Sequence, residues 1–484
     1  MVALGNISGW QQPHGPVTTW MASPAAREAA RAARRSDIPP TYQRAQHLRK
    51  AYSGKAMGRQ LPRLMVVAWD IPGVCDIPAM TAAINAHLRQ HDAYHHWFEF
   101  ENGVFVLRMI DSPELIDFVP VNFGYMNTEQ IRTHVLTTTP GTLEWDCFTF
   151  GIAQHTDYFT FYASVDHLHI DGISAGLIFF DIHLKYRHLA AAVDKHQPST
   201  LTQVRSYRDY AARQHDKLAS LTLSSPEIKG WIDFAQDADG DWPSFPLPLG
   251  EMQANEGAFV TVELLNGVDT EAFETACRAA STRFIGGVLA CVALAERDLV
   301  GTETYHGYTP HDTRTPGIDT MTVGWFASLV PVTVPTGTGS FPEAARAAQN
   351  SFDVAKHLAG VPIDRVLELA TAAQLEIKPP TRPAMMVSFI DFRKIPVSAL
   401  WEETNFGTYG DNLSHGEINV WINRHAARTT VTVSFPDNPV ARESVHRYIA
   451  ALREVFVRAA ESISDWVNAV AEQADSYEVY DLTA

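Results

Sequence analysis

Hydrophobic and polar positions along the chain predict strands and helices in alternation. Short runs rich in β-branched and aromatic residues favour strands, and longer stretches with apolar residues three or four positions apart favour helices. Strands are expected at residues 64–69, 104–109, 159–165, 259–265, 328–334, 384–389 and 429–435. Helices are expected at residues 78–90, 175–189, 207–221, 269–281, 286–297, 342–358 and 441–460. This mixture predicts an α/β fold in which helices cover sheets.

The clearest interruption of the pattern is the segment 237–256. Its first fourteen residues hold three prolines and two glycines, which continue neither a helix nor a central strand. Single cores stop growing at roughly 250 to 300 residues, and the chain has 484. We therefore expect an N-terminal domain at 1–236, a linker at 237–256 and a C-terminal domain at 257–484. No repeat is legible between the halves.

Composition narrows the class of protein. Apolar residues make up 46% of the chain and charged residues 19%, which is typical of a globular interior and argues against disorder. The net charge of -17 disfavours nucleic acid as a partner, because a phosphate backbone requires a positive surface. The one basic stretch, Arg27 to Arg35, is interpreted as a solvated helix. A weaker interpretation is contact with an anionic membrane face or with a phosphate of coenzyme A.

The sequence also indicates a compartment. The amino terminus lacks the basic start and apolar core of a signal peptide, so we expect a cytoplasmic protein, at most peripheral to the inner face of the membrane. The longest apolar stretch, 284–295, is shorter than the roughly 20 residues of a membrane span and predicts a buried helix. Four cysteines without framework spacing indicate reduced thiols, and Cys277 and Cys291 are read as core residues.

The most informative segment follows the predicted strand at 159–165. It reads Asp166-His167-Leu168-His169-Ile170-Asp171-Gly172. A strand and an Asp-Gly turn can hold a histidine rigidly, and Gly172 tolerates backbone angles that other residues avoid. Rigid placement is what proton abstraction requires. In this first interpretation, H-x-x-x-D-G, His167 is a general base that takes the proton of an acceptor hydroxyl, and Asp171 anchors the turn.

A second interpretation is a metal site, because His167, His169 and Asp171 also spell H-x-H-x-D. Alternate positions of an extended segment point the same way, so the three side chains could meet at one ion. The pattern occurs in zinc hydrolases of the metallo-β-lactamase type, but there a further histidine stands where this chain has Gly172. The distant ligands also have no specific candidates among the 20 histidines. This interpretation ranks below the first.

A third interpretation is a nucleophile elbow, since residues 172–176 match G-x-S-x-G. The strand that feeds such an elbow is nearly all apolar, whereas the five residues before Gly172 include two histidines and an aspartate. Ser174 is read more simply as a residue near the start of the next helix that satisfies free backbone N–H groups.

The alternative to all three is that His167 has only a structural role and that its hydrogen bonds are satisfied within a turn. The combination of apolar strand, His, spaced Asp-Gly and apolar helix favours a functional role over that alternative, although short motifs produce false matches. The adjacent pair His95 and His96 lacks this context, because Trp97 and Phe98 follow it rather than Asp-Gly. That pair is read as a half-buried strand edge.

The central segment resembles the H-H-x-x-x-D-G motif of the condensation-domain and chloramphenicol-acetyltransferase-like acyltransferases. The surrounding chain looks like the mycobacterial polyketide-associated (Pap) acyltransferases of the trehalose-acylating branch. Residues 88–98 are similar to the family's helix-end Arg-His-Asp segment, and 323–332 to its second-half G-W-F strand. Arg314 falls where the family keeps an arginine that pairs with the motif aspartate. Residues 434–439 look like the late turn of that branch, and the matches run from about residue 15 to residue 462.

Two departures from the family pattern are informative. Asp166 stands in place of the first motif histidine, which fits the view that only the second, matched by His167, performs the chemistry. No D-F-G-W-G block is recognisable, and the late segment 414–424 resembles the trehalose-acylating branch rather than peptide-bond-forming condensation domains. A peptide synthetase role is therefore disfavoured.

The resemblance implies a fold and a place for the site. Each half would carry a chloramphenicol-acetyltransferase-like sheet, and the halves would meet in a V with a tunnel between them. His167 would lie midway along the tunnel, with the acyl thioester entering from one face and the sugar from the other. Asp171, paired with Arg314, and Gly172 would shape the turn. The alternative for Arg314 is a solvated loop arginine.

The resemblance also implies an activity. The acyl group of an acyl-CoA, or of a carrier-protein thioester, would pass to a hydroxyl of trehalose or of an acylated or sulfated trehalose in cell-envelope glycolipid biosynthesis. His167, neutral near its ordinary pKa of about 6.5, would act as base without a covalent intermediate. No cofactor and no metal are expected, acyl-CoA being a substrate, and the protein is expected to be a monomer with transient membrane or synthase contact. The alternatives are a metal-dependent hydrolase at His167, His169 and Asp171, and a non-catalytic relative that binds acyl chains.

Overall fold

Seven strands form the largest sheet of the computed structural model, which describes residues 3–191, 204–239, 242–251, 256–378, 382–395, 398–411, 413, 414 and 416–475. The strand order in this sheet is β1 (Ala3–Asn6), β14 (Gly407–Gly410), β4 (Leu64–Pro72), β9 (Tyr158–Asp166), β8 (Phe148–Gln154), β2 (Gly15–Ala22) and β7 (Phe118–Met126). The central strand β9 runs antiparallel to both β4 and β8 and is buried almost throughout. Helices α3 (Ile77–Gln90) and α5 (Gly172–Ala191) cover one face, and α4 (Thr128–Thr138) covers the other.

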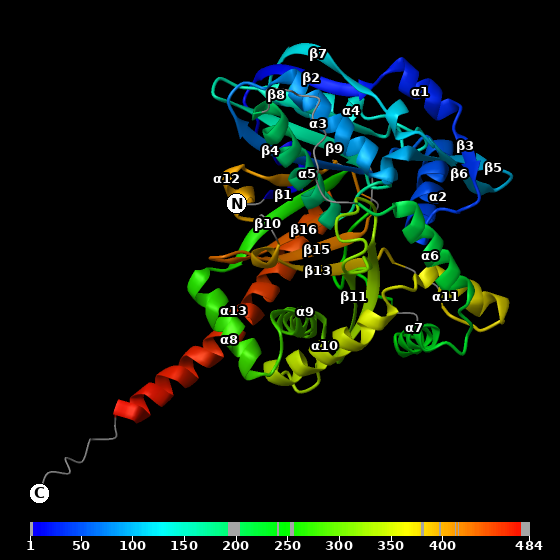
Figure 1. Cartoon of the computed structure of the whole chain (residues 1–484). Coiled ribbons are helices and arrows are strands. Elements are labelled where there is room, and N and C mark those ends of the chain that lie inside the picture. Colours follow the sequence, from blue (N-terminus) through cyan, green and yellow to red (C-terminus); the bar gives the residue numbers. More distant parts are fainter. Residues whose placement is uncertain are drawn as a thin grey trace, which may run out of the picture.

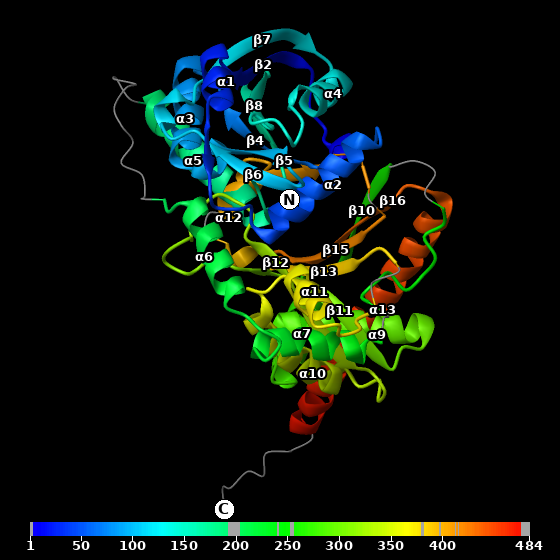
Figure 2. The same cartoon turned by 90° about the vertical axis from the view of Figure 1, so that its right-hand side faces the viewer.

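A six-stranded sheet forms the core of the second half of the chain. Its order is β10 (Gly257–Leu265), β16 (Thr429–Pro436), β15 (Ile418–Arg424), β13 (Met385–Asp391), β11 (Thr304–Asp312) and β12 (Ala327–Pro335). Four helices pack on it through one hydrophobic core: α8 (Gly267–Ala279), α9 (Phe284–Val300), α10 (Phe341–Ala355) and α13 (Pro439–Asp475). Figures 1 and 2 show the two sheets in separate lobes, with the end of α13 projecting away from the second lobe.

Smaller elements lie around these two sheets. A three-stranded sheet has the order β3 (Arg34–Ser36), β6 (Val104–Met109) and β5 (His96–Glu101). The remaining α-helices are α1 (Pro24–Arg31), α2 (Tyr42–Ala56), α6 (Tyr207–Ala219), α7 (Pro226–Asp237), α11 (Ile363–Ala372) and α12 (Ser398–Glu403). Short 3-10 helices are η1 (Ile7–Gly9), η2 (Asp92–His95), η3 (Pro113–Leu115), η4 (Lys356–Leu358) and η5 (Phe392–Lys394).

The predicted α/β class is confirmed, and each of the fourteen predicted segments is a strand or helix of the expected type. The strand expected at 104–109 is β6, with the same ends. The helix expected at 342–358 is α10, which stops at Ala355 and continues as the 3-10 helix η4. Strands such as β2 and β14, and the helix α2, were not predicted, because their short or polar sequences lack a clear period. The V-shaped arrangement and the tunnel stay predictions.

The division into domains also stays a prediction, and the sheet topology adds a complication to it. Strand β14 comes from the second half of the chain but lies between β1 and β4 of the first sheet. The expected linker 237–256 packs against the second lobe, since Trp242, Phe245 and Leu247 are buried there. Its residues 240, 241 and 252–255, and residues 476–484 of the expected C-terminal domain, lie outside the described part of the chain.

Two expectations about surface and membrane segments can be compared with the structure. The stretch from Arg27 to Arg35, expected to be a solvated helix, is helical only as far as Arg31, and Arg34 begins strand β3. Its four arginines each lie within 4 Å of a carboxylate. The apolar stretch at 284–295 is inside α9 and is buried, as predicted. Among the described helices none is long and apolar enough to cross a membrane by itself, although α8 and α9 pass that test as a pair bent by 97°.

Candidate active site

The segment singled out in the sequence forms a turn between the central strand and helix α5. Strand β9 ends at Asp166, and α5 begins at Gly172. The backbone N–H of His167 donates to the carbonyl of Arg63 at 2.7 Å, and the N–H of His169 donates to the carbonyl of Asp166 at 2.9 Å. The turn is therefore tied to the end of the sheet, and the position of His167 is set by backbone hydrogen bonds.

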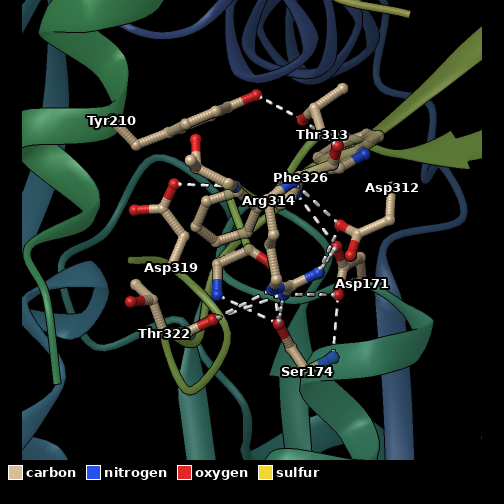
Figure 3. Close-up of polar contacts among 12 residues, drawn as sticks. Asp171, Ser174, Tyr210, Asp312, Thr313, Arg314, Asp319, Thr322 and Phe326 are labelled. Carbon is tan, nitrogen blue, oxygen red and sulfur yellow. Dashed lines mark hydrogen bonds and ion pairs between the residues drawn. The ribbon is translucent and has the colours of Figure 1, made fainter. Parts of the chain in front are cut away.

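Asp171 and Arg314 form a buried, bidentate ion pair between the two halves of the chain (Figure 3). Arg314 Nη1 donates to Asp171 Oδ2 and Nη2 to Oδ1, both at 3.1 Å. Each side chain keeps only 3% of its exposure. The carboxylate also accepts the backbone N–H groups of Ser174, at 2.8 Å, and Phe326, at 2.9 Å. Asp171 thus caps α5 and binds the second lobe, and the predicted pairing with Arg314 is confirmed.

The charges of this pair are balanced. Burial opposes ionisation of Asp171, but Arg314 and the two backbone N–H groups outweigh it and hold the pKa of the carboxyl below its usual range. Arg314 donates further to Ser174 Oγ at 2.7 Å and to Asp312 Oδ1 at 3.0 Å, and its guanidinium lies 4.1 Å from the centre of the Phe326 ring. The alternative of a solvated loop arginine is wrong.

His167 lies against an indole and near a second histidine. Its ring centre is 4.0 Å from that of Trp325 and 6.4 Å from that of His47. Nδ1 is enclosed and makes no hydrogen bond with another residue in the part of the chain that the structure describes, so Nε2 is the nitrogen left to meet a substrate. Burial and the neighbouring His47 lower the pKa of His167 to about 4. The expectation of an ordinary pKa near 6.5 is therefore wrong, and the ring is neutral at neutral pH.

Asp166, which stands in place of the family's first motif histidine, is the centre of a second buried network. Its Oδ1 lies 2.8 Å from His47 Nε2, and its Oδ2 accepts from Thr142 Oγ1 at 2.6 Å and from Arg63 Nη1 at 3.3 Å. Burial opposes the charge, but His47 and Arg63 hold the pKa of Asp166 well below its usual range. An ionised carboxylate thus precedes His167 in the chain and faces His47.

The structure does not bring together the three residues of the proposed metal site. The alternation argument needs an extended segment, but β9 ends at Asp166 and the next residues turn. His169 points into an aromatic layer, 5.4 Å from Phe148 and 5.9 Å from Tyr94 between ring centres, and burial lowers its pKa to about 3. The described residues contain no group of ligands formed by His167, His169 and Asp171.

A different trio with ligand-like spacing occurs between α3 and α5. It consists of His87, His91 and Asp181. His87 Nδ1 lies 2.7 Å from Asp181 Oδ2, and the Lys185 ammonium donates to Oδ1 of the same carboxylate. The negative charge of Asp181 is already compensated by Lys185, and adding a divalent cation would leave a buried excess of positive charge. We read this trio as a structural network between the two helices.

The contacts of Ser174 exclude the interpretation of residues 172–176 as a nucleophile elbow. Its Oγ donates to the carbonyl of Gly324 at 2.8 Å and accepts the N–H of the same residue at 3.0 Å. The hydroxyl is buried and fully engaged, so it is not available as a nucleophile. The expectation that Ser174 satisfies free N–H groups of its own helix is also wrong, because Asp171 performs that role and Ser174 joins α5 to the second lobe.

The backbone of Gly172 does not require a glycine, contrary to the expectation from the sequence. Its φ is not positive, and a Cβ atom built there would meet open space. The glycine that the fold does require is Gly324, where a Cβ would lie 2.1 Å from the ring of Tyr207. Tyr207 donates its hydroxyl to the carbonyl of Trp325 at 2.7 Å, so this close approach sets the position of the indole beside His167.

The remaining sequence candidates are structural. His95 and His96 are buried, with 6% and 1% exposure, rather than half-buried; the first ends η2 and the second begins β5. Cys277 and Cys291 are free and buried, as predicted.

Sequence reasoning missed two site residues, His47 and Arg63. They lie more than 100 positions before Asp166, on α2 and just before β4, in segments with no motif. Trp325 was noted only as part of a strand-like match, although residues 313–326 lie outside a strand and only Ala327 begins β12. No local pattern signals such contacts, because they depend on the packing of distant elements.

Comparison with known proteins identifies the family to which this chain belongs. The family model for the condensation domain matches residues 63–378. Acyltransferase PapA3 of Mycobacterium tuberculosis is 44% identical over 467 residues, covering 95% of this chain and 97% of that protein. Trehalose-2-sulfate acyltransferase PapA2 of the same organism is 44% identical over 464 residues, covering 95% and 98%. The solved structure of PapA2 acyl transferase superposes with a TM-score of 0.90, at 44% identity, covering 95% of this chain and 99% of that one.

The chain therefore belongs to the condensation-domain family of acyltransferases, with the chloramphenicol-acetyltransferase-like fold. Within that family it is an O-acyltransferase similar over nearly its whole length to the mycobacterial Pap proteins.

Proposed function

We propose that this protein transfers an acyl group from a thioester, either acyl-CoA or a carrier-protein thioester, to a hydroxyl of a trehalose-type sugar. The observation that carries the proposal is a neutral, partly exposed His167 whose turn is fixed by the ion pair between Asp171 and Arg314. The names of two relatives support the acceptor, since one acts on trehalose-2-sulfate and another is a 2'-acyl-2-O-sulfo-trehalose acyltransferase. A place in cell-envelope glycolipid synthesis follows from such a product.

The proposed step needs one base and no covalent intermediate. His167 Nε2 takes the proton of the sugar hydroxyl as its oxygen attacks the thioester carbonyl. The C–S bond then breaks, the ester C–O bond remains, and the proton passes from His167 to the departing thiolate. Asp171 and Arg314 hold the turn and take no proton. Gly172, with open space in place of a side chain, leaves room beside the base for substrate.

The ion pair also supports a site between the lobes, because Arg314 belongs to the second half and Asp171 to the first. We propose that the two substrates approach His167 from opposite faces of this junction. No cofactor and no metal enter the proposed step. The protein would act as a monomer, near the membrane or a synthase when the acyl donor is delivered.

The test is incubation of the purified protein with palmitoyl-CoA and a panel of trehalose, trehalose-2-sulfate, sucrose and glucose, with products read by mass spectrometry. We expect an ester of trehalose or of its sulfate. No acyl sugar with any acceptor, together with release of free palmitate, would favour the hydrolase class instead. Binding of palmitoyl-CoA without turnover would favour the non-catalytic class.

Replacing the base gives the matching prediction. His167→Ala should lower kcat by roughly 10²- to 10⁴-fold, the usual contribution of a general base, while the melting temperature stays near that of the parent. His306→Ala is the matched control, since His306 pairs with Asp237 at 2.9 Å on the second lobe, far along the chain from the turn. A His167→Ala protein that acylates at the parent rate would show that His167 is not the base.

A further inference from the structure

A second histidine accompanies the base. His47, on α2, lies 6.4 Å from His167 between ring centres, and its Nε2 lies 2.8 Å from Asp166 Oδ1. The side chain of Asp166 is fully enclosed, whereas that of His47 keeps 11% of its exposure. The pair therefore joins the buried end of β9 to the space beside His167.

Asp166 determines which nitrogen of His47 carries a proton. The carboxylate already accepts hydrogen bonds from Thr142, Arg63 and the N–H of Leu168, the last at 3.0 Å, and it is ionised. An ionised carboxylate only accepts, so the nitrogen that faces it, Nε2 of His47, must donate. The ring can then gain a second proton only at Nδ1.

The indole of Trp325 contacts both rings. Its centre lies 4.0 Å from that of His167 and 5.7 Å from that of His47, which meets it edge-on. Tyr207 in turn holds the backbone of Trp325 through the hydrogen bond to its carbonyl.

We propose that His47 is a positioning residue of this active site: clamped by Asp166, it braces the Trp325 indole on which the ring of His167 packs, and it disfavours a proton on His167. The inference rests on the proposed role of His167 as the base. It also gives a role to Asp166, which stands at the position of the first motif histidine. Its carboxylate binds His47 of the distant helix α2 and so holds that histidine at the site.

The charged groups around His167 support this role. His47, from α2, disfavours a proton on His167, whereas Asp171 and Asp166, at the two ends of the turn, favour one. Each of these carboxylates already has an arginine partner, Arg314 for Asp171 and Arg63 for Asp166. With both carboxylates compensated, His47 is the neighbour whose removal should change the protonation of His167.

The experiment compares two substitutions of His47 in the full-length protein. His47→Gln keeps an N–H donor for Asp166 but has no titratable group, and His47→Leu removes both. His306→Gln, which replaces a histidine with its own aspartate partner elsewhere, is the matched control. The titration of the His167 ring is followed by NMR with histidine-selective labelling, from neutral pH down to the lowest pH at which circular dichroism shows the protein folded. The His167 signals are identified by their loss in His167→Ala.

We expect the pKa of His167 to rise by roughly one pH unit in both His47 variants and to stay unchanged in His306→Gln. The acid limb of kcat/KM should move to higher pH by the same amount, so that activity on that limb falls about tenfold more than activity at alkaline pH. His47→Leu should also lower kcat at alkaline pH, because Asp166 loses a hydrogen bond.

An unchanged titration of His167 in folded His47→Gln would overturn the proposal, even if activity falls equally at every pH. If His47→Gln does not fold, His47→Asn answers the same question. The NMR readout needs no substrate, so it tests the pairing of the rings even if the proposed acyl transfer is wrong. A failure of the proposed acyl-transfer mechanism would be seen separately, as undiminished activity in His167→Ala.

Discussion

At the scale of the residue, the neighbours of the proposed base His167 determine its pKa. With a pKa of about 4, His167 is neutral at pH 7 and would need no deprotonation before it acts. The same low pKa makes it a weaker base than a free imidazole, so transfer must depend on the positioning of hydroxyl and thioester. The motif predicted the residue, and the burial and His47 that set its pKa became visible only in the structure.

Substitution by alanine should change the free energy of unfolding very differently at two glycines near the site. Gly172→Ala should leave the free energy of unfolding within about 0.5 kcal/mol of the parent, because its Cβ meets open space on an exposed helix end. Gly324→Ala should cost about 1 to 3 kcal/mol or more, because its Cβ would overlap the ring of Tyr207. Urea unfolding of both variants measures this. Equal stability losses would contradict the assignment of the required glycine to position 324.

At the scale of elements, the site is a strand, a turn and a helix held by a segment of the other lobe. The continuous apolar run predicted β9, and the apolar helical stretch predicted α5. The segment that carries Arg314 and Phe326 lies between β11 and β12, and its contacts with Asp171 lock the turn from outside. Family resemblance anticipated the arginine, but nothing local in the sequence indicated Ser174 and Gly324 as the second connection.

Breaking this connection should be costly. Arg314→Met would leave the carboxylate of Asp171 buried and without its cation, so we expect a loss of about 3 to 5 kcal/mol in the free energy of unfolding. Arg458→Met is the control, because its partner Asp298 and Arg458 itself are about half exposed, and it should cost at most about 1 kcal/mol. Chemical denaturation measures both. A loss in Arg314→Met no larger than in Arg458→Met would disprove a structural role for the ion pair.

At the scale of the whole molecule, the two lobes are interdependent. Strand β14 of the second half fills the place between β1 and β4, and the ion pair at the active site crosses the same junction. The hydrophobic core of the first lobe also takes in Val323, Trp401 and Phe406 from the second half. Helix α7 already packs against residues of the second half, so the chain changes lobe before the proline-rich segment. Residues 1–236 alone would also leave the first sheet incomplete.

Buried histidines should make the whole protein sensitive to mild acid. Burial lowers the pKa of His87 and His167 to about 4 and of His96 and His169 to about 3. Between those values and the ordinary value near 6.5, only the unfolded chain takes up these protons, so stability falls as the pH falls below about 6.5. Each of the four should cost about 1 kcal/mol between pH 6.5 and 5.5.

Thermal unfolding in a pH series measures this effect. We expect the melting temperature to drop between pH 6.5 and 5.5, well above the range in which the paired carboxylates such as Asp171 begin to protonate. A melting temperature that stays constant down to about pH 5 would contradict the buried, neutral state of these rings. His169→Phe, which replaces one of them by an aromatic hydrocarbon in an aromatic layer, should reduce the dependence on pH.

The sequence by itself determined the α/β class, the main strands and helices, the candidate base His167 and the anchoring Asp171, because these depend on local periodicity and on a motif seven residues long. Only the tertiary structure decided that Ser174 bonds Gly324 rather than its own helix, that Gly324 and not Gly172 is sterically required, and that His47 and Arg63 converge on Asp166. The physical reason is that periodicity reports which face of an element is buried, whereas contacts between side chains over 100 positions apart exist only after the sheets have packed.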